Sequence, residues 1–226
     1  MGKITGREEL EKVPPKVRQM YRAVVELIGE GEEIAELRVS TITGRAGIGK
    51  GTAYEYFDSK EEIVACAITY AIESSFRRLE TELLEKEDFC GQLEYLLDEI
   101  ERKDDRKVCF LRFLHLLTDT SDFSDLIRQK LCMESISEGT SRRYTPTTVF
   151  CKVLERARER GEQRGDLPMD YMIYSLFSHL MLYMMAVTAK QGGGTEGAAI
   201  RPYVWQAIMK DLNIGVQVMR KERAQE

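Results

Sequence analysis

Proline is scarce in this sequence, with five residues among 226, and this scarcity favours long uninterrupted helices. The cysteines show no organised pattern either. Their number is odd, they lie far apart and no two form a C-x-x-C motif; they are Cys66, Cys90, Cys109, Cys132 and Cys151. Such spacing speaks against a disulfide framework or a zinc site and favours free thiols in a reducing cytosol. We therefore expect no bound metal and no cofactor.

An excess of positive charge is also missing. The formal net charge is −5, and residues 1–62 hold ten Lys and Arg against twelve Asp and Glu. Any basic surface for a nucleic acid must therefore be local. The opening residues, "MGKITGREEL", lack the apolar core of a signal peptide, which predicts a cytoplasmic protein.

Only one long stretch lacks charged residues. Residues 171–189, "YMIYSLFSHLMLYMMAVTA", contain no Asp, Glu, Lys or Arg and reach the roughly 20 residues that span a bilayer. The stretch also carries Ser175, Ser178, His179 and Thr188. A helix that is apolar nearly all round is buried either in protein or in lipid. We interpret this one as buried in protein at a subunit interface and expect no membrane contact, with a membrane span as the alternative.

What the sequence does contain is one helical pattern after another, which predicts an all-α fold. The first pattern begins near Pro14 and Pro15, ends at Gly31, and has six apolar residues at helical spacing. A long pattern follows from Lys60, after the capping residues Asp58 and Ser59. Later helices are expected around residues 93–100, 108–117, 123–136, 147–161, 169–190 and 203–223.

The stretch "GRAGIGKGT" almost forms a phosphate-binding loop. Gly44, Gly49 and Lys50 match G-x-x-x-x-G-K-[ST], but Gly51 stands where Ser or Thr is required. A P-loop also belongs to a strand–loop–helix unit, and no alternation of strands and helices follows. A nucleotide-binding enzyme is therefore a minor alternative. We instead interpret the glycines as part of a tight turn between two short helices.

In this reading, residues 39–46 form the first short helix and Gly47 supplies a left-handed turn. The second helix, residues 50–56, is too short to be stable alone. Its side chains suit DNA: Lys50 brings charge, Thr52 a hydroxyl, and Gly51 lets the backbone approach closely. Two short helices of this kind predict a helix-turn-helix unit.

The segment "VSTITGRAGIGKGTAYEYFDSKEEI" resembles the helix-turn-helix signature of the TetR family of transcriptional regulators. The resemblance covers residues 13–70. It implies a three-helix DNA-binding domain at residues 13–70, after an N-terminal arm at 1–12. It also implies a helical effector-binding and dimerisation domain at residues 71–226. The implied function is that of a ligand-responsive regulator, most often a repressor, and not an enzyme. The alternative is an all-α module that binds a protein or a lipid and not DNA.

Three sets of site residues are expected: the first follows from the resemblance, and the other two from large or apolar side chains on the later helices. Contacts to double-stranded operator DNA are expected from Arg38, Thr41, Arg45, Gly49, Lys50, Gly51, Thr52, Tyr54, Tyr56 and Lys60. Arg38 and Arg45 could instead be solvated surface residues that do not contact DNA. The ring of Tyr54 could instead pack within the domain. A small, largely apolar effector is expected to contact Phe110, Phe113, His115, Phe150 and Tyr183. The interface of a homodimer is expected to include Tyr174, Phe177, Met181, Met184, Val204, Ile208, Leu212 and Val216.

Overall fold

The computed structural model describes residues 3–4, 10–102, 145–188 and 199–215. In these ranges the regular structure is helical, with one isolated antiparallel bridge between Gln163 and Ile214 and no strand. The predicted all-α class is confirmed. The described residues form two compact units, one up to Ser75 and the other from Phe76 onward. The helices expected around residues 108–117 and 123–136 lie outside the described residues.

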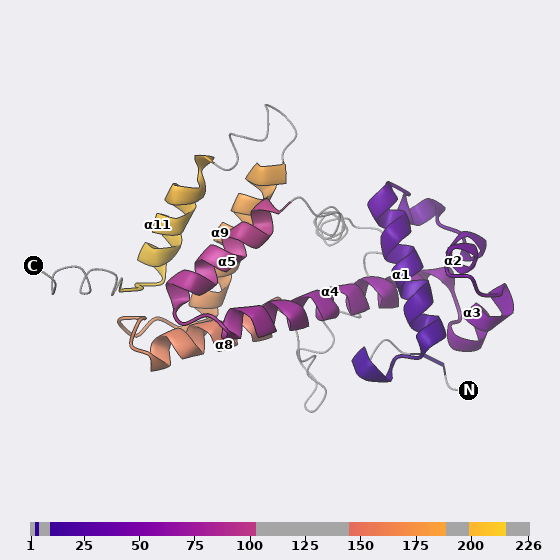
Figure 1. Ribbon diagram of the computed structural model, residues 1–226, viewed down its shortest axis with the longest axis horizontal. Helices are drawn as coiled ribbons and strands as arrows, with labels where there is room; N and C mark the ends of the chain where they lie inside the picture. Colours follow the sequence, from indigo (N-terminus) through magenta and orange to yellow (C-terminus); the bar gives the residue numbers. More distant parts are fainter. Residues whose placement is uncertain (1–2, 5–9, 103–144, 189–198, 216–226) are drawn as a thin grey trace, which may run out of the picture. The chain divides into compact units, whose positions relative to one another are not determined.

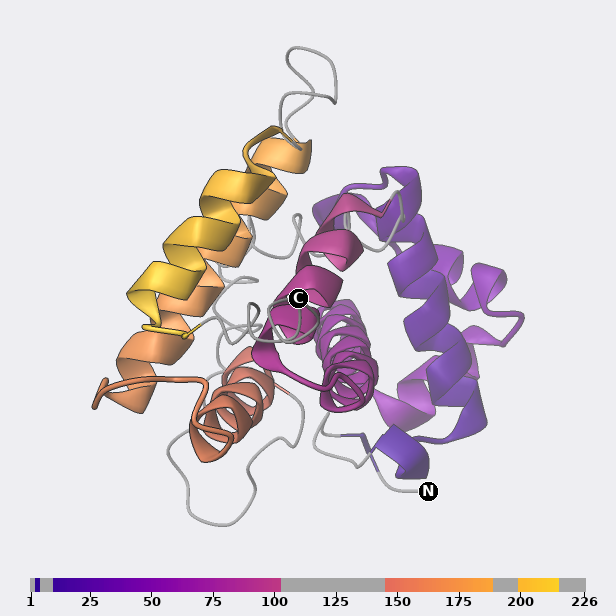
Figure 2. The same cartoon turned by 60° about the vertical axis from the view of Figure 1, so that its left-hand side comes forward.

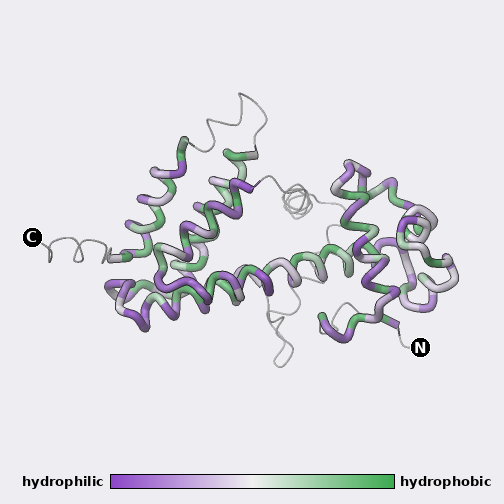
Figure 3. The backbone as a smooth tube through the Cα atoms, in the orientation of Figure 1, coloured by the Kyte–Doolittle hydropathy of each residue, from purple (hydrophilic) through white to green (hydrophobic). Residues whose placement is uncertain are grey.

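The N-terminal unit is built around α1, a helix whose ends follow from its sequence (Figure 1). Pro15 occupies its first position, where no backbone donor is needed, and Gly31 ends it with a φ of 106°. Hydrophobic and hydrophilic residues alternate along α1 from turn to turn (Figure 3). The elements of the unit are η1 (Leu10–Lys12), α1 (Pro15–Glu30), η2 (Ile34–Glu36), α2 (Val39–Arg45), α3 (Lys50–Tyr56) and the start of α4 (Lys60–Leu84).

The core of this unit lies between α1 and the first turns of α4. Val17, Met20 and Val24 of α1 are fully buried, as are Ile63 and Val64 of α4. Burial of each such side chain is worth about 1.5–3 kcal/mol, far more than the intrinsic propensity of a seven-residue helix. The short helices α2 and α3 therefore depend on this core for their stability.

The C-terminal unit is organised around α9, which packs against α5, α8 and α11. Figures 1 and 2 both show α11 lying alongside α9. Side-chain caps start two of the helices: Asp88 accepts from Gly91 N at 2.7 Å, and Thr145 and Thr148 form a capping box. The elements are the end of α4, then α5 (Phe89–Glu101), α8 (Pro146–Glu159), α9 (Met169–Thr188) and α11 (Arg201–Asp211).

Because α9 is covered by three other helices, its apolar character has an explanation within the protein. Met172, Leu176 and Tyr183 are completely buried. Among the residues that the structure describes, no helix has the length and hydrophobicity needed to cross a bilayer. Burial in protein is therefore the reading of residues 171–189 that the described helices support.

The last helix is shorter than the sequence suggests. The expected helix at residues 203–223 is wrong in its extent, because α11 ends at Asp211. Asn213 then takes a left-handed φ of 51°, and Ile214 forms the bridge with Gln163. Gly215 N donates to Glu162 O at 2.8 Å, so the chain is held against the segment that follows α8.

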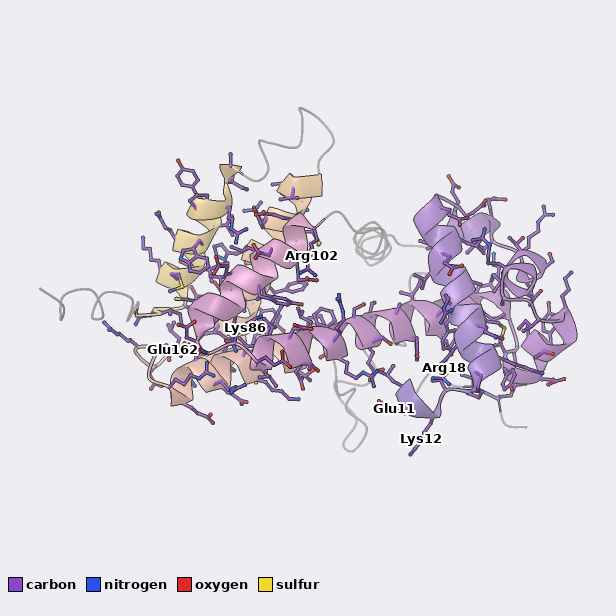
Figure 4. The ribbon with its side chains drawn as sticks, in the orientation of Figure 1. Glu11, Lys12, Arg18, Lys86, Arg102 and Glu162 are labelled. Carbon is purple, nitrogen blue, oxygen red and sulfur yellow. The ribbon has the colours of Figure 1, made fainter. Side chains whose placement is uncertain are left out.

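The end of α4 is closed by polar groups from other elements of its unit. Arg156 of α8 donates to the Leu84 carbonyl at 2.8 Å, and the buried Gln92 side chain donates to the Leu83 carbonyl at 3.0 Å. The Glu162 carboxylate accepts from Phe89 N at 2.7 Å at the start of α5; Lys86 and Glu162 are labelled at this junction in Figure 4. These bonds satisfy helix-end groups that would otherwise lack partners.

Candidate nucleic-acid interface

The two short helices meet at a turn that depends on a glycine. Gly47 has a φ of 67°, a conformation that costs other residues about 1–2 kcal/mol. Ile48 N donates to Thr43 O at 3.0 Å, which closes the end of α2. Gly49 then caps α3 in an extended conformation. The predicted helix–turn–helix and the predicted role of Gly47 are confirmed.

Behind the two helices lies the core, and their other face is open to solvent. Ile42, Ala53 and Phe57 are fully buried and fix the orientation of α2 and α3. Tyr54, for which DNA contact and packing within the domain were the two alternatives, is 51% exposed. Six other predicted DNA contacts are exposed: Arg38, Thr41, Arg45, Gly49, Lys50 and Gly51; Thr52 is half-buried.

A hollow of about 450 Å³ opens on this face and gathers positive charge. It is lined by residues 35–40, which run from η2 into α2, together with Lys50 and Tyr54 of α3 and Lys60 of α4. Arg38, Lys50 and Lys60 supply three cations from three segments; Glu36 is the one acid among the lining residues, and the Glu61 carboxylate lies beside Lys60. An open surface depression with this charge suits the phosphate groups of a nucleic-acid backbone.

Lys60 is already engaged at the edge of this hollow. Its ammonium group donates to the Ala35 carbonyl at 2.8 Å and lies 3.6 Å from the Glu61 carboxylate. Its side chain is 24% exposed, so it holds the start of α4 against η2 while still lining the hollow. A phosphate there would share this lysine with a backbone acceptor.

Arg45 has a protein partner. Its guanidinium forms a two-pronged contact with the Glu30 carboxylate, at 2.7 and 2.8 Å, which ties α2 to the end of α1. This hydrogen-bonded arginine lowers the pKa of the Glu30 carboxyl below its usual value. Arg45 is exposed, and its contact with DNA stays a prediction.

The prediction that Tyr56 contacts DNA is wrong for this conformation. Its side chain is only 1% exposed and belongs to the core of the N-terminal unit. The reason is the helical period: Tyr56 lies three residues after buried Ala53, on the same face of α3. Tyr54, two residues earlier, lies on the opposite side and is exposed.

The predicted effector contacts divide into two groups. Phe110, Phe113 and His115 lie outside the described residues. Phe150 is buried, with its ring centroid 6.4 Å from both Phe76 and Phe177. Tyr183 is buried and its hydroxyl donates to the Glu101 carboxylate, which also pairs with Arg201 at 2.9 Å. Burial, and then the bond to Glu101, raise the pKa of Tyr183.

Several predicted dimer residues are used inside one chain instead. Met184, Val204, Ile208 and Leu212 are buried where α9 and α11 pack together. Burial within one chain leaves these four little surface to offer to a second copy, and their place at an interface stays a prediction. Tyr174 is 70% exposed, and Phe177 and Met181 are half-buried, so their role at an interface stays a prediction. Val216 lies outside the described residues.

Two features of the structure were not predicted from the sequence. Lys3 and Ile4 lie against the end of α3: Lys3 donates to the Tyr54 carbonyl at 2.9 Å, and Ile4 N donates to the Tyr56 carbonyl at 2.9 Å. No local pattern announces this contact between residues about 50 apart. The second feature is a stripe of exposed residues on α9: Tyr171, Tyr174, Ser178, Leu182 and Met185. Helical spacing places these residues on one side of α9, but only the packing of the other helices shows that this side is exposed.

Comparison with known proteins matches this geometry. Residues 26–66 fit the family model of bacterial regulatory proteins, tetR family. The HTH-type transcriptional regulator YvdT of Bacillus subtilis (strain 168) is 24% identical over 160 residues, which cover 64% of this chain and 81% of YvdT.

Solved structures have a similar fold over most of the length of this chain. The fatty acid degradation regulator FadR from Bacillus halodurans has a TM-score of 0.62 at 17% identity, over 90% of this chain and 100% of that one. FadR from Bacillus subtilis, in complex with stearoyl-CoA, has a TM-score of 0.60 at 18% identity, over 85% and 97%. A TetR-family regulator from Rhodococcus sp., described as putative, has a TM-score of 0.63 at 14% identity, over 88% and 100%.

Proposed function

We propose that this chain, a transcriptional regulator of the TetR family, binds operator DNA through α2 and α3 and releases it when a small molecule binds to the C-terminal unit. The observation that carries the DNA-binding part is the cationic hollow beside α3. Arg38, Lys50 and Lys60 converge there, although the chain as a whole is acidic. A local cluster of cations on an acidic protein is the arrangement that a phosphate backbone requires.

Within this proposal the residues have separate tasks. Lys50 and Arg38 contact phosphates, and Lys60 supports them from the start of α4. Thr52 and Tyr54 face the groove with a hydroxyl each, while Gly51 lets the backbone of α3 come close. Two copies of α3 would enter successive major grooves, with half-sites about 34–36 Å apart.

The test uses the full chain and duplexes that it selects from a genomic fragment library. We expect Lys50→Ala to weaken binding and to lower the slope of log K against log salt by about 0.9, the value for one lost phosphate contact. Lys210→Ala is the control, because Lys210 is also exposed but lies on α11. A wild-type chain with no salt-dependent affinity for any duplex would instead favour the protein- or lipid-binding alternative.

The proposed regulator is a homodimer joined through an exposed stripe on α9. The members of this stripe, Tyr171, Tyr174, Ser178, Leu182 and Met185, are separated by three or four residues and therefore lie on one side of the helix. Four of the five are large and apolar or aromatic, and Tyr203 of α11 is exposed as well, at 73%. A row of exposed apolar side chains of this kind is typical of an interaction surface.

The proposed effector is a small molecule with a substantial apolar part. The proposed response is release of a repressor from DNA. A protein that acts on operator DNA in this way would work in the cytoplasm. In support, aromatic rings pack together in the C-terminal unit, as Phe150 does with Phe76 and Phe177. FadR from Bacillus subtilis, which shares the fold, was solved with stearoyl-CoA. Stearoyl-CoA is therefore the first ligand to test.

A further inference from the structure

We infer that Lys3 and Ile4 form a clamp that positions the DNA-reading helix α3, a role that rests on the proposed DNA-binding function. The Lys3 ammonium group donates to the carbonyls of Tyr54 at 2.9 Å and Phe57 at 3.2 Å, and Ile4 N donates to the carbonyl of Tyr56 at 2.9 Å. Three carbonyls at the C-terminal end of α3 are thus bound by two consecutive residues.

The clamp matters because buried side chains fix the orientation of α3 but do not satisfy the backbone carbonyls at its C-terminal end. It has seven residues, its N-cap residue Gly49 offers no side-chain cap, and an isolated helix of this length is unstable. The last carbonyls of any helix lack partners within the helix. Lys3 satisfies two carbonyls at this end with a positive charge, which also suits the negative end of the helix dipole.

Two further contacts anchor the clamp. The Ile4 side chain is buried in the same core as Ala53 and Tyr56 of α3. The Lys3 ammonium group also lies 2.7 Å from the Asp58 carboxylate, in the link between α3 and α4. Burial of the Ile4 side chain and the ion pair of Lys3 with Asp58 therefore fix the positions of these two residues. Lys3 is then a positioning residue, one that orders α3 without touching DNA.

The positioning role and a direct DNA contact predict different results for Lys3→Met, which keeps the aliphatic stem but loses the donors. Lys16→Met is the control, because it removes one charge from an exposed lysine of the same unit. Binding of the selected duplex is measured at several salt concentrations, and hydrogen exchange of the α3 amides is measured without DNA. The control separates loss of the clamp from loss of charge alone.

If the clamp positions α3, Lys3→Met will weaken binding about three- to tenfold with an unchanged salt slope, and will speed exchange of the α3 amides, while Lys16→Met leaves that exchange as in wild type. A salt slope lower by about 0.9 with unchanged exchange would identify a direct phosphate contact and overturn the inference. Wild-type affinity together with wild-type exchange would overturn it too. If the wild-type chain binds no duplex, the proposed function fails, and the exchange rates still decide whether the clamp orders α3.

Discussion

Gly51 is the residue at which stability and DNA binding should conflict. It lies inside α3, where a Cβ atom would meet no atom within 4 Å in the free chain. A glycine inside a helix costs about 0.5–1 kcal/mol relative to alanine. We therefore expect Gly51→Ala to stabilise the free protein by about that amount and to weaken operator binding at least tenfold, because the methyl group would separate α3 from DNA.

Thermal unfolding and DNA titration of the same preparation measure the two effects. Gly44→Ala is the matched control: Gly44 lies inside α2, and a Cβ there also meets no atom within 4 Å. It should give a similar gain in stability with affinity within about twofold of wild type. Equal affinity of wild type and Gly51→Ala would show that α3 does not approach DNA closely at this position.

The two tyrosines of α3 show where sequence reasoning ends at this scale. The motif identified the helix, the turn glycine Gly47 and the exposed Lys50. It did not separate Tyr54 from Tyr56, because a helix of seven residues has only about two turns, too few for its apolar period to fix which side faces the core. The three-dimensional core decides that Tyr56 is buried and Tyr54 is exposed.

Among the helices, α4 depends on a partner from elsewhere in the sequence. Arg156 of α8 donates to the Leu84 carbonyl at 2.8 Å and is only partly exposed. A hydrogen bond to a charged group is worth about 1.5–3 kcal/mol when buried, and exposure reduces this value. We expect Arg156→Met to lower the free energy of unfolding by about 1 kcal/mol in urea titrations.

Lys152→Met is the comparison from the same helix. Lys152 pairs with the Glu80 carboxylate at 2.8 Å; its own side chain is about half exposed, whereas that of Glu80 is only 12% exposed. The exposed lysine keeps the pair near the roughly 0–1 kcal/mol of a surface ion pair. The arginine variant should therefore lose more stability than the lysine variant. The reverse order would mean that the end of α4 does not need this cap.

Helix positions followed from local sequence better than helix ends did. Pro15 and Gly31 mark the ends of α1 within the sequence itself, and both were recognised. The end of α11 depends instead on the pairing of Ile214 with Gln163, about 50 residues away. Apolar periodicity continued past Asp211 and predicted a longer helix, because a pattern within one segment carries no information about such a distant partner.

At the scale of the whole molecule, exposed and buried apolar residues of α9 and α11 predict opposite effects of a charged substitution. Leu182 is 58% exposed, whereas Ile208 is completely buried. We expect Leu182→Asp to give a folded monomer in sedimentation, because it places a charge in the proposed dimer stripe. Ile208→Asp should instead lose the helical circular dichroism signal, since it buries an unpaired charge and leaves a cavity, at a cost of about 4–5 kcal/mol or more. A folded Leu182→Asp dimer would exclude this surface as the interface.

Sequence alone could not distinguish these two kinds of residue. Residues 171–189 are apolar nearly all round, so hydropathy marks every face of α9 as a candidate for burial. The structure shows which faces are covered by α5, α8 and α11. What stays exposed after that packing is the stripe from Tyr171 to Met185.

Regulation is a property of the whole molecule, because it requires two sites that affect each other. If effector and operator favour different arrangements of the same dimer, each must weaken the binding of the other by the same factor, typically 5- to 150-fold. Calorimetric titration of stearoyl-CoA with and without a saturating selected duplex measures one side of this relation, and titration of the duplex with and without stearoyl-CoA measures the other. We expect both titrations to give the same ratio of affinities, well above one. A ligand that binds with the same affinity in both states shifts no equilibrium, so a factor of one would show that stearoyl-CoA is not the signal that releases this protein from DNA.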